Sequence, residues 1–545
     1  MKRITFITFI LFKTLTSGAG DLTESIRHFV DNKPVSSCYE INNECLLSGK
    51  MLPLFYMNRI YAPAWFEHDT LGNNGYVLLN YIRNVGMQGL QPEDYHLFLI
   101  EKYIWKMLCP FSKDTTDMMR LDLLLTDAFL LLGSHLYYGK VDPEKEGSSW
   151  KMQRKNTELR IDMKLEQALA GNDVDNELNM LAPKYRSYWM MKEELAFFLR
   201  LNEQFWPEIV SDTAIKPGES NKLIPEIRKR LIKLRYPLSD SSSVLFNEEL
   251  VQQLKKFQQD WGLNSDGVIG KSTLEDLNNL PYKLISQLKV NMERYRWLPL
   301  QVTEKYIIVN IANFKLDLIA GADTLISMRV IVGKEPRTTP VFNERLSYIV
   351  FSPTWTVPRT ILNDDVIPEL LKGPEYLEKR NMILLRHDGS ELAYNDIDWS
   401  TISKTNFPYR VRQNPGPGNS LGRVKFMFPN TYDVYIHDTP LKGSFASDNR
   451  DISSGCIRVE KPFDLAVLLL SDTPEWTPEN ILKAMQQDKE QTVRLKIPVD
   501  VVMIYLTAWT DGRDRIQFRK DIYQRDEKVI QALNQKLYAI KSKPL

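Results

Sequence analysis

The sequence predicts a multidomain α+β protein in which an α-helical N-terminal half precedes a mainly β C-terminal half. The chain has 545 residues, which is enough for about three or four domains of ordinary size. Apolar residues recur at helical spacing before residue 290 and in short alternating runs after it. The polar stretch 214–221, which contains Pro and Gly, is expected to be a linker within the helical half.

The composition is that of an ordinary folded protein. Hydrophobic residues make up 43% of the chain and charged residues 26%, so wholesale disorder is not expected. Lys and Arg number 70 against 69 Asp and Glu, which leaves a net charge of +1. A chain this close to neutral has no overall basic field to hold a polyanion, so we expect no nucleic acid partner.

The first residues predict export from the cytoplasm. Lys2 and Arg3 precede the apolar run 4–12, and small residues at 17–19 follow at the spacing that a signal peptidase reads. The run is too short to span a bilayer, so residues 1–19 are expected to be a cleaved signal peptide, with membrane contact only if cleavage fails. The alternative is a buried N-terminal strand. No later segment of the sequence is long and apolar enough to cross a membrane.

The four cysteines each need their own explanation. In an oxidising compartment Cys38 and Cys45 can form a local disulfide, or they can remain two unpaired thiols. Their spacing is not one that zinc sites use and the six histidines are scattered, so no metal site is predicted. Cys109 lies among apolar residues and is expected to be a small buried hydrophobe. Cys456 remains as the candidate for chemistry.

Residues 20–213 are expected to form a helical scaffold domain. Two stretches carry the helical period, one at 121–136 and one at 195–201. The first is strongly amphipathic, with apolar residues at Leu121, Leu124, Leu125, Ala128, Phe129, Leu132 and Leu136.

A compact three-helix domain is expected at 222–281. Two apolar stripes at helical intervals are followed by a turn at 264–267 and by a third helix that runs from Gly270 to Leu277. The stripes consist of Ile227, Leu231 and Leu234, and of Leu250, Leu254, Phe257 and Trp261. Such stripes form a core whatever the domain binds.

This segment resembles the peptidoglycan-binding domain type 1 family. The family pattern F-Q-x-x-x-G-L-x-x-D-G-x-x-G-x-x-T is matched by Phe257-Gln258, Gly262-Leu263, Asp266-Gly267, Gly270 and Thr273. The resemblance implies that residues 222–281 bind the bacterial cell wall.

Residues 290–525 are expected to form a mainly β domain. Gly and Pro bound its short alternating runs, as is typical of strands, at 306–312, 328–332, 348–351 and 432–437. The last strands are expected at 499–507 and 515–523, before a helical tail at 526–545. Residues 362–421 interrupt two consecutive strands and are too long for an ordinary loop, so they are expected to fold as a lid.

The candidate chemistry lies at His437 and Cys456. Cys456 follows the turn 453–455, in which a glycine permits backbone angles that other residues avoid. A neutral imidazole near a thiol can take its proton, which gives the thiolate–imidazolium pair that attacks acyl carbons. His437 ends an alternating run, whose period of two puts Tyr435 on the same face. From spacing alone, the alternative stays open that Cys456 is a core residue and His437 an unrelated strand-end histidine.

The pattern resembles the signature of L,D-transpeptidases with the YkuD-type catalytic domain, H-x(14–17)-[ST]-x-G-C. His437 is followed by fifteen residues and then by Ser453-Ser454-Gly455-Cys456. Ser454 stands where most members have His, as it does in the large periplasmic branch of Gram-negative bacteria. Further segments that resemble this branch lie at 61–65, 89–96, 125–128, 291–294, 296–299, 332–334, 337–340, 355–358, 415–417 and 421–426.

The resemblance implies a reaction in two acyl transfers. Cys456 would attack a tetrapeptide stem of peptidoglycan, release the terminal D-Ala and pass the acyl group to an amine of a second stem, which makes a 3-3 cross-link. His437 would act as the base, and backbone N–H groups at Gly455 and Cys456 would form the oxyanion hole. The residues at 362–421 would cap the cleft.

The resemblance also implies a setting. The partners would be the donor and acceptor stems, with carbapenems as inhibitors, and no metal or cofactor would be needed. The location would be the periplasm, and the roles would be cell wall biogenesis and cell shape. Two alternatives remain: a hydrolase of the stems, such as an L,D-carboxypeptidase, whose acyl-enzyme is taken by water, and a non-catalytic wall-binding protein.

Five further residues are candidates for substrate binding. Arg458 suits bidentate recognition of a stem carboxylate, although an ordinary ion pair is an alternative. Tyr435 can hydrogen-bond substrate or form a wall of the cleft. Trp355 can line the site or serve as a core residue, and Ser453 and Ser454 can orient groups in the turn or simply belong to it.

Overall fold

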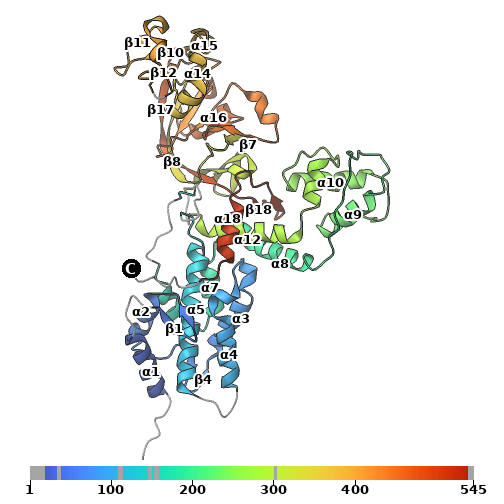
Figure 1. Ribbon diagram of the computed structural model, residues 1–545, viewed down its shortest axis with the longest axis vertical. Helices are drawn as coiled ribbons and strands as arrows, with labels where there is room; N and C mark the ends of the chain where they lie inside the picture. Colours follow the sequence, from blue (N-terminus) through green and yellow to red (C-terminus); the bar gives the residue numbers. More distant parts are fainter. Residues whose placement is uncertain are drawn as a thin grey trace, which may run out of the picture.

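The structure, a computed structural model, describes residues 19–32, 38–108, 114–144, 150–152, 159–299, 303–404 and 406–537. The predicted signal, apart from its last residue, and Cys109 lie outside these ranges, as do the last eight residues of the predicted tail. Within them, no helix has the length and apolar character needed to cross a membrane. The helical N-terminal region lies at one end of the long axis in Figure 1, and the insert of the β domain lies at the other.

The N-terminal region packs around one long helix, α5 (Thr115–Tyr138). Asp114 caps this helix by accepting a hydrogen bond from the Thr116 N–H at 3.0 Å. The predicted amphipathic stretch 121–136 lies inside it and is buried. The surrounding helices are α1 (Ala19–Asp31), α2 (Met51–Asn58), α3 (Asn73–Arg83), α4 (Leu97–Met107), α6 (Ile161–Gly171) and α7 (Val174–Leu181). The next helix, α8 (Arg186–Leu201), packs against the later helix that begins at Pro281.

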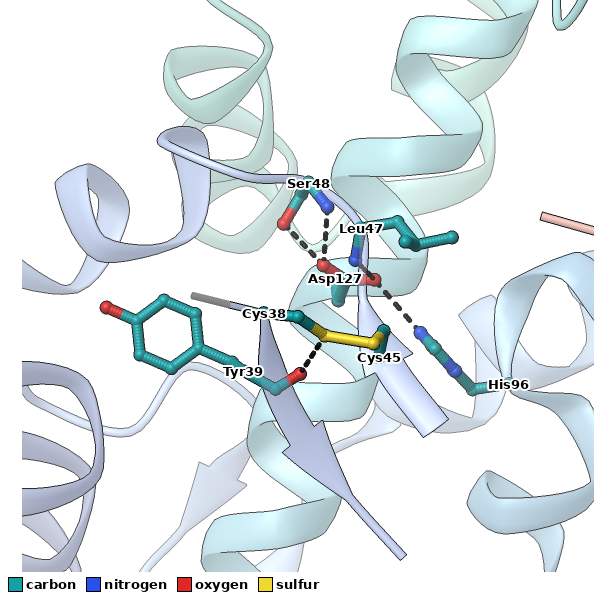
Figure 2. Close-up of a disulfide and its surroundings, with 7 residues drawn as sticks. All are labelled: Cys38, Tyr39, Cys45, Leu47, Ser48, His96 and Asp127. Atoms are coloured by element: carbon teal, nitrogen blue, oxygen red, sulfur yellow. Dashed lines mark hydrogen bonds and ion pairs between the residues drawn. A yellow bond between two sulfur atoms is a disulfide. The ribbon is translucent and has the colours of Figure 1, made fainter. Parts of the chain in front are cut away.

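Two short hairpins complete this region: β1 (Tyr39–Ile41) with β2 (Glu44–Leu46), and β3 (Phe66–Glu67) with β4 (Thr70–Leu71). A disulfide joins Cys38 to Cys45 across the first hairpin, which settles the choice that the sequence left open (Figure 2). The disulfide places Glu44, the neighbour of Cys45, beside His96 at the start of α4.

His96 is buried between two carboxylates (Figure 2 shows the contact with Asp127). Its Nε2 lies 2.9 Å from Asp127 and its Nδ1 lies 2.8 Å from Glu44. Asp127 also accepts hydrogen bonds from the Ser48 N–H and hydroxyl at 2.8 and 2.5 Å. Burial lowers the pKa of His96, but hydrogen bonds and charge from Asp127 and Glu44 outweigh burial and raise the pKa to about 9. The imidazolium therefore ties the disulfide hairpin to α5.

The three-helix domain consists of α9 (Ile224–Lys233), α10 (Glu248–Asp260) and α11 (Lys271–Leu277), so the predicted third helix is confirmed. Gln258, which is buried, holds the turn by donating to the Val268 carbonyl at 3.0 Å and accepting from the Gly267 N–H at 2.9 Å. The predicted linker at 214–221 is wrong. Ile215 is 1% exposed and pairs with Ile269, so this part of the stretch is packed onto the three-helix domain.

Helix α12 (Pro281–Trp297) leads from this domain into a closed β-sheet. The nine strands follow the order β15-β7-β16-β14-β13-β8-β17-β5-β6, and β6 also pairs with β7, which closes eight of them into a ring. The strands are β5 (Lys305–Asn310), β6 (Lys315–Ala320), β7 (Asp323–Gly333), β8 (Asn343–Phe351), β13 (Val424–Met427), β14 (Ile436–His437), β15 (Asp451–Ser453), β16 (Ile457–Val459) and β17 (Gln491–Ile504). Helix α16 (Pro462–Leu469) packs against β7 of the ring, and α17 (Pro478–Met485) packs against α16.

Two strand predictions need correction. The run at 432–437 is a strand only over its last two residues, because Asp433 adopts a left-handed backbone with φ of 53°. The segment 515–523 does not join the large sheet: β19 (Ile516–Phe518) pairs only with β18 (Ala508–Thr510) among the described strands. This hairpin instead contacts the three-helix domain, where Phe518 lies 4.9 Å from Trp261 between ring centres.

The insert has a hydrophobic core of its own, which runs from Val357 to Val411. Its sheet has the strand order β11-β10-β12-β9. Its elements are β9 (Trp355–Thr356), α13 (Arg359–Ile361), α14 (Ile367–Leu370), α15 (Glu375–Lys379), β10 (Met382–Leu385), β11 (Glu391–Leu392) and β12 (Arg410–Gln413). After the large sheet, α18 (Asp526–Asn534) returns to pack on α12.

The charge on His96 predicts a pH-dependent stability. Because the folded pKa of about 9 is above the ordinary value of 6.5, the stabilisation is full below about pH 6.5 and is lost as the pH rises through about 9. Denaturant unfolding at a series of pH values should show this decline.

His96→Gln should remove the slope and lower the free energy of unfolding by about 3–5 kcal/mol at acidic pH, because Asp127 then lacks its counter-charge. His28→Gln, at an exposed position of α1, is the control and should keep the slope. A wild-type stability that rises between these pH values would contradict the assignment.

Candidate active site

A cavity of about 980 Å³ lies between the insert and the ring of strands. It brings together seven of the eight residues that the sequence singled out, namely Trp355, Tyr435, His437, Ser453, Ser454, Cys456 and Arg458. The eighth, Gly455, is buried in the turn before Cys456 and does not line the cavity. Among the described residues, no group of His, Cys, Asp and Glu side chains is arranged to hold a metal ion.

Two parallel neighbouring strands place the reactive side chains. β14 pairs with β16 so that His437 lies beside Arg458, and the Ile457 N–H donates to the Tyr435 carbonyl at 3.1 Å. This register puts Cys456 next to Tyr435. The ring centres of Tyr435 and His437 lie 5.6 Å apart, as the expected shared face requires.

The turn before Cys456 is held from within. Gly455 has φ of 112°, a conformation that side chains disfavour. The Ser453 hydroxyl accepts from the Gly455 N–H at 3.2 Å and donates to the Cys456 carbonyl at 2.7 Å. Ser453 thus forms its hydrogen bonds within the turn, while Ser454 is partly exposed at the cavity. The expectation that the Gly455 N–H forms part of the oxyanion hole is wrong, because this N–H is bonded to Ser453.

His437 is buried, with 4% of its surface exposed. Its Nδ1 lies 2.5 Å from the Asp438 carbonyl oxygen, which can only accept, so Nδ1 carries a proton, and a second backbone hydrogen bond at Leu421 also raises the pKa of His437. Burial and the nearby charge of Arg458 lower the pKa of His437 to about 3. The lowered pKa favours the neutral imidazole in spite of these hydrogen bonds.

Cys456 is the free cysteine of the described residues. Its Sγ lies 3.7 Å from the Asp433 carbonyl oxygen. Burial raises the pKa of the Cys456 thiol to about 11, against opposing effects of Tyr435 and Arg458. The pKa shifts of both groups thus favour the neutral forms, a thiol on Cys456 and an imidazole on His437.

Arg458 is a cation at the wall of the cavity. Its guanidinium makes no hydrogen bond or ion pair with any other residue that the structure describes, and its Nε is buried. Burial lowers the pKa of Arg458, whose charge in turn favours the Cys456 thiolate and disfavours a His437 imidazolium. An unpaired guanidinium at the wall of a cavity is suited to an anionic ligand.

The remaining walls come from two aromatic residues and from the insert. Burial raises the pKa of Tyr435 well above its ordinary value, so its hydroxyl stays protonated. Trp355 lies on β9, where it pairs with Gln413 and packs against the core of the insert. The sequence did not single out the charged residues that the insert contributes to the cavity, which are Asp365, Glu369, Lys372, Glu375, Lys379 and Arg380.

Three family models match parts of the chain. Residues 50–195 match the "Scaffold domain", residues 220–277 the "Putative peptidoglycan binding domain", and residues 304–478 the "L,D-transpeptidase catalytic domain". His437, Cys456 and Arg458 lie within the last match. The matches confirm both resemblances seen in the sequence and the predicted α+β class with a helical N-terminal scaffold.

Individual proteins are also similar. A "Putative L,D-transpeptidase" of Haemophilus influenzae is 35% identical over 246 residues, which are 45% of this chain and 49% of that protein. The chain thus spans about half the length of this curated relative. A solved L,D-transpeptidase from Mycobacterium smegmatis is 13% identical with a TM-score of 0.19, over 37% of this chain and 58% of the other. One from Stackebrandtia nassauensis is 12% identical with a TM-score of 0.21, over 53% and 94%.

The neutral resting site predicts how Cys456 reacts with a simple alkylating agent. Because only the thiolate reacts, the rate with iodoacetamide should rise about tenfold per pH unit and level off near pH 11, where the raised pKa lies. Mass spectrometry of the intact protein measures the rate, and Cys456→Ala gives the background. A plateau that begins below about pH 8 would show instead a preformed thiolate–imidazolium pair.

Proposed function

We propose that this chain, which carries an L,D-transpeptidase catalytic domain and a peptidoglycan-binding domain, is a peptidoglycan L,D-transpeptidase that forms 3-3 cross-links through a thioester on Cys456. The observation that supports this most is the shared cavity. A free thiol, an imidazole whose Nδ1 is hydrogen-bonded to the Asp438 carbonyl, and a guanidinium with no partner among the described residues line one space between the insert and the ring of strands.

The first step acylates Cys456. Since thiol and imidazole both start neutral, the thiol proton passes to His437 Nε2 as sulfur attacks the carbonyl carbon of the third stem residue. The carbonyl electrons move to oxygen and then return as the bond to the terminal D-Ala breaks. The imidazolium gives its proton to the leaving amine. The product is a thioester with a neutral His437.

The second step transfers the acyl group. A side-chain amine of another stem attacks the thioester, and His437 Nε2 accepts the proton that the amine loses. The carbon–sulfur bond breaks, and the proton on His437 returns to sulfur, which restores the thiol. If water attacks in place of the amine, the same acyl-enzyme gives a carboxypeptidase. The identity of the products therefore distinguishes the two activities.

The cavity also suggests how the stem is held. Arg458 binds a carboxylate of the stem by hydrogen bonds to its guanidinium, since nothing among the described residues neutralises it. Tyr435 and Trp355 form walls beside the reacting groups, and Ser454 lies at the rim of the turn. The insert, which in the structure begins at β9 (Trp355–Thr356) and not at residue 362 as expected, closes the space from the other side.

The domain plan follows from this function. Residues 20–213 act as the scaffold, 222–281 hold the wall, and 290–525 carry the catalysis, with 526–545 as the tail. The chain works in the periplasm of a Gram-negative envelope after export by residues 1–19, in cell wall biogenesis and cell shape. The donor and acceptor are peptidoglycan stems, and carbapenems acylate Cys456. The membrane is touched only if the signal stays uncleaved.

Removal of the nucleophile or the base tests the proposal. With disaccharide-tetrapeptide as substrate, Cys456→Ala should give neither acyl-enzyme nor cross-linked dimer, and His437→Gln should lower the rate by about 10²–10⁴-fold because the proton then has no acceptor. Mass spectrometry identifies the products. His387→Gln, at an exposed position of the insert, is the matched control and should keep the wild-type rate. Cross-linked dimer from Cys456→Ala would refute the mechanism, and tripeptide as the sole wild-type product would refute transpeptidation.

The role of Arg458 predicts a change in substrate affinity. Arg458→Met keeps the apolar length but loses the charge, so KM for the tetrapeptide donor should rise by about 10–150-fold, as expected for one charge-assisted hydrogen bond of about 1.5–3 kcal/mol. Arg458→Lys should recover part of this loss. Arg494→Met, at an exposed position of β17 outside the cavity lining, is the control. An unchanged KM in Arg458→Met would show that the guanidinium does not bind the donor.

A further inference from the structure

The carbonyl side of the nucleophile turn is held by a threonine outside the signature motif. The Thr339 hydroxyl donates to the Gly455 carbonyl at 2.8 Å and accepts from the Gly333 N–H at 2.9 Å. Thr339 is completely buried. Its hydroxyl thus joins the end of β7 to the turn that carries Cys456.

The backbones meet here at close range. A Cβ atom at Gly333 would lie 2.2 Å from the Arg337 carbonyl oxygen and 2.9 Å from Gly455 Cα, so only glycine fits. The short distance leaves no room for the turn to shift toward β7. Thr339 therefore acts on a turn whose position is already confined.

Tyr523 supports Gly333 and Thr339 from the side away from Gly455. Its hydroxyl donates to the Gly333 carbonyl and accepts from the Thr339 N–H at 3.4 Å. The ring stacks on Tyr505 with centres 5.5 Å apart, and the Arg525 guanidinium lies 4.5 Å from its centre. These three residues follow the segment 304–478 that matches the catalytic domain model.

The hydrogen bond to Gly455 fixes the direction of a neighbouring donor. In a trans peptide the C=O and the following N–H point in opposite directions, and the bond between Gly455 and Cys456 is not among the cis bonds of the described chain. With the Gly455 carbonyl bound to Thr339, the Cys456 N–H must point away from Thr339. This N–H makes no hydrogen bond to another described residue, whereas the Gly455 N–H is taken by Ser453.

We infer that Thr339, supported by Tyr523, is a positioning residue that aims the Cys456 N–H at the oxyanion formed during acyl transfer. The inference rests on the proposed function for its substrate. As Cys456 Sγ bonds to the carbonyl carbon, the thiol proton goes to His437 and the carbonyl electrons move to oxygen. That oxygen then accepts a hydrogen bond from the Cys456 N–H. Thr339 does not touch the substrate but keeps this donor in place.

Removal of the hydroxyl tests the inference. Thr339→Val keeps the shape of the side chain, so kcat for acylation by tetrapeptide should fall about 10–100-fold, somewhat less than the loss of about 10²–10³-fold for removing a direct donor. KM should stay within about twofold. The alkylation rate with iodoacetamide should also stay within about twofold, since that reaction forms no oxyanion. Thr339→Ser should restore acylation, and Tyr523→Phe should lower it less than Thr339→Val does.

Two further measurements separate the outcomes. Thr338→Val is the matched control, because the Thr338 hydroxyl contacts Arg525 and not Gly455, and it should keep wild-type kcat. An unchanged kcat in Thr339→Val, or equal losses of acylation and alkylation, would overturn the inference. Acylation by p-nitrophenyl acetate, which also forms an oxyanion, is measured in parallel. If tetrapeptide does not acylate the wild type but Thr339→Val slows acylation by p-nitrophenyl acetate, the proposed function is wrong and the inference about Thr339 stands.

Discussion

The arrangement of the chain depends on the buried charges of α12. Glu293 and Arg296 are both completely buried and lie 2.6 Å apart. Arg296 also donates to the Gln88 carbonyl and to the Tyr188 hydroxyl, and Glu293 accepts from the Val141 N–H at 2.7 Å. All three outside partners belong to the N-terminal scaffold. Loss of one member of such a pair leaves the other charge unpaired, at a cost of about 3–5 kcal/mol.

The opposite face of the same helix reaches the catalytic domain. Asn291 exchanges hydrogen bonds with Thr507, and Arg294 forms an ion pair with Asp526 at 2.6 Å. Asp526 begins α18, which follows directly after Tyr523 and Arg525 in the chain. The segment from Thr507 to Asp526, which follows the large sheet, therefore connects the buried charges of α12 to the residues that support the turn before Cys456. Scaffold and active site are parts of one packed structure.

The sequence predicted what depends on neighbouring residues and missed what depends on distant ones. Periodicity located α5, the third helix of the small domain and most core strands, and the turn motif located Cys456 and His437. Neither the periodicity nor the turn motif could show that β6 pairs with β7 to close the ring. The linker prediction at 214–221 failed because Ile215, one apolar residue in a polar stretch, gives no periodic signal of its burial. Tyr523 gave no local signal. Thr339 lies in the segment 337–340 that resembles the family, but its contact with the turn could not be predicted, since the contacts of Thr339 and Tyr523 span 116 and 190 residues.

The raised thiol pKa has a consequence for the durability of the protein. The Cys38–Cys45 disulfide is the product of an oxidising environment, in which an unpaired cysteine meets peroxides and foreign disulfides. Both kinds of reagent react with the thiolate. With a pKa of about 11 for Cys456, the thiolate fraction at neutral pH is about 10⁻⁴, roughly a hundredfold below that of a thiol at 9.0. The raised pKa of Cys456 thus slows the reaction of this thiol with such oxidants at neutral pH.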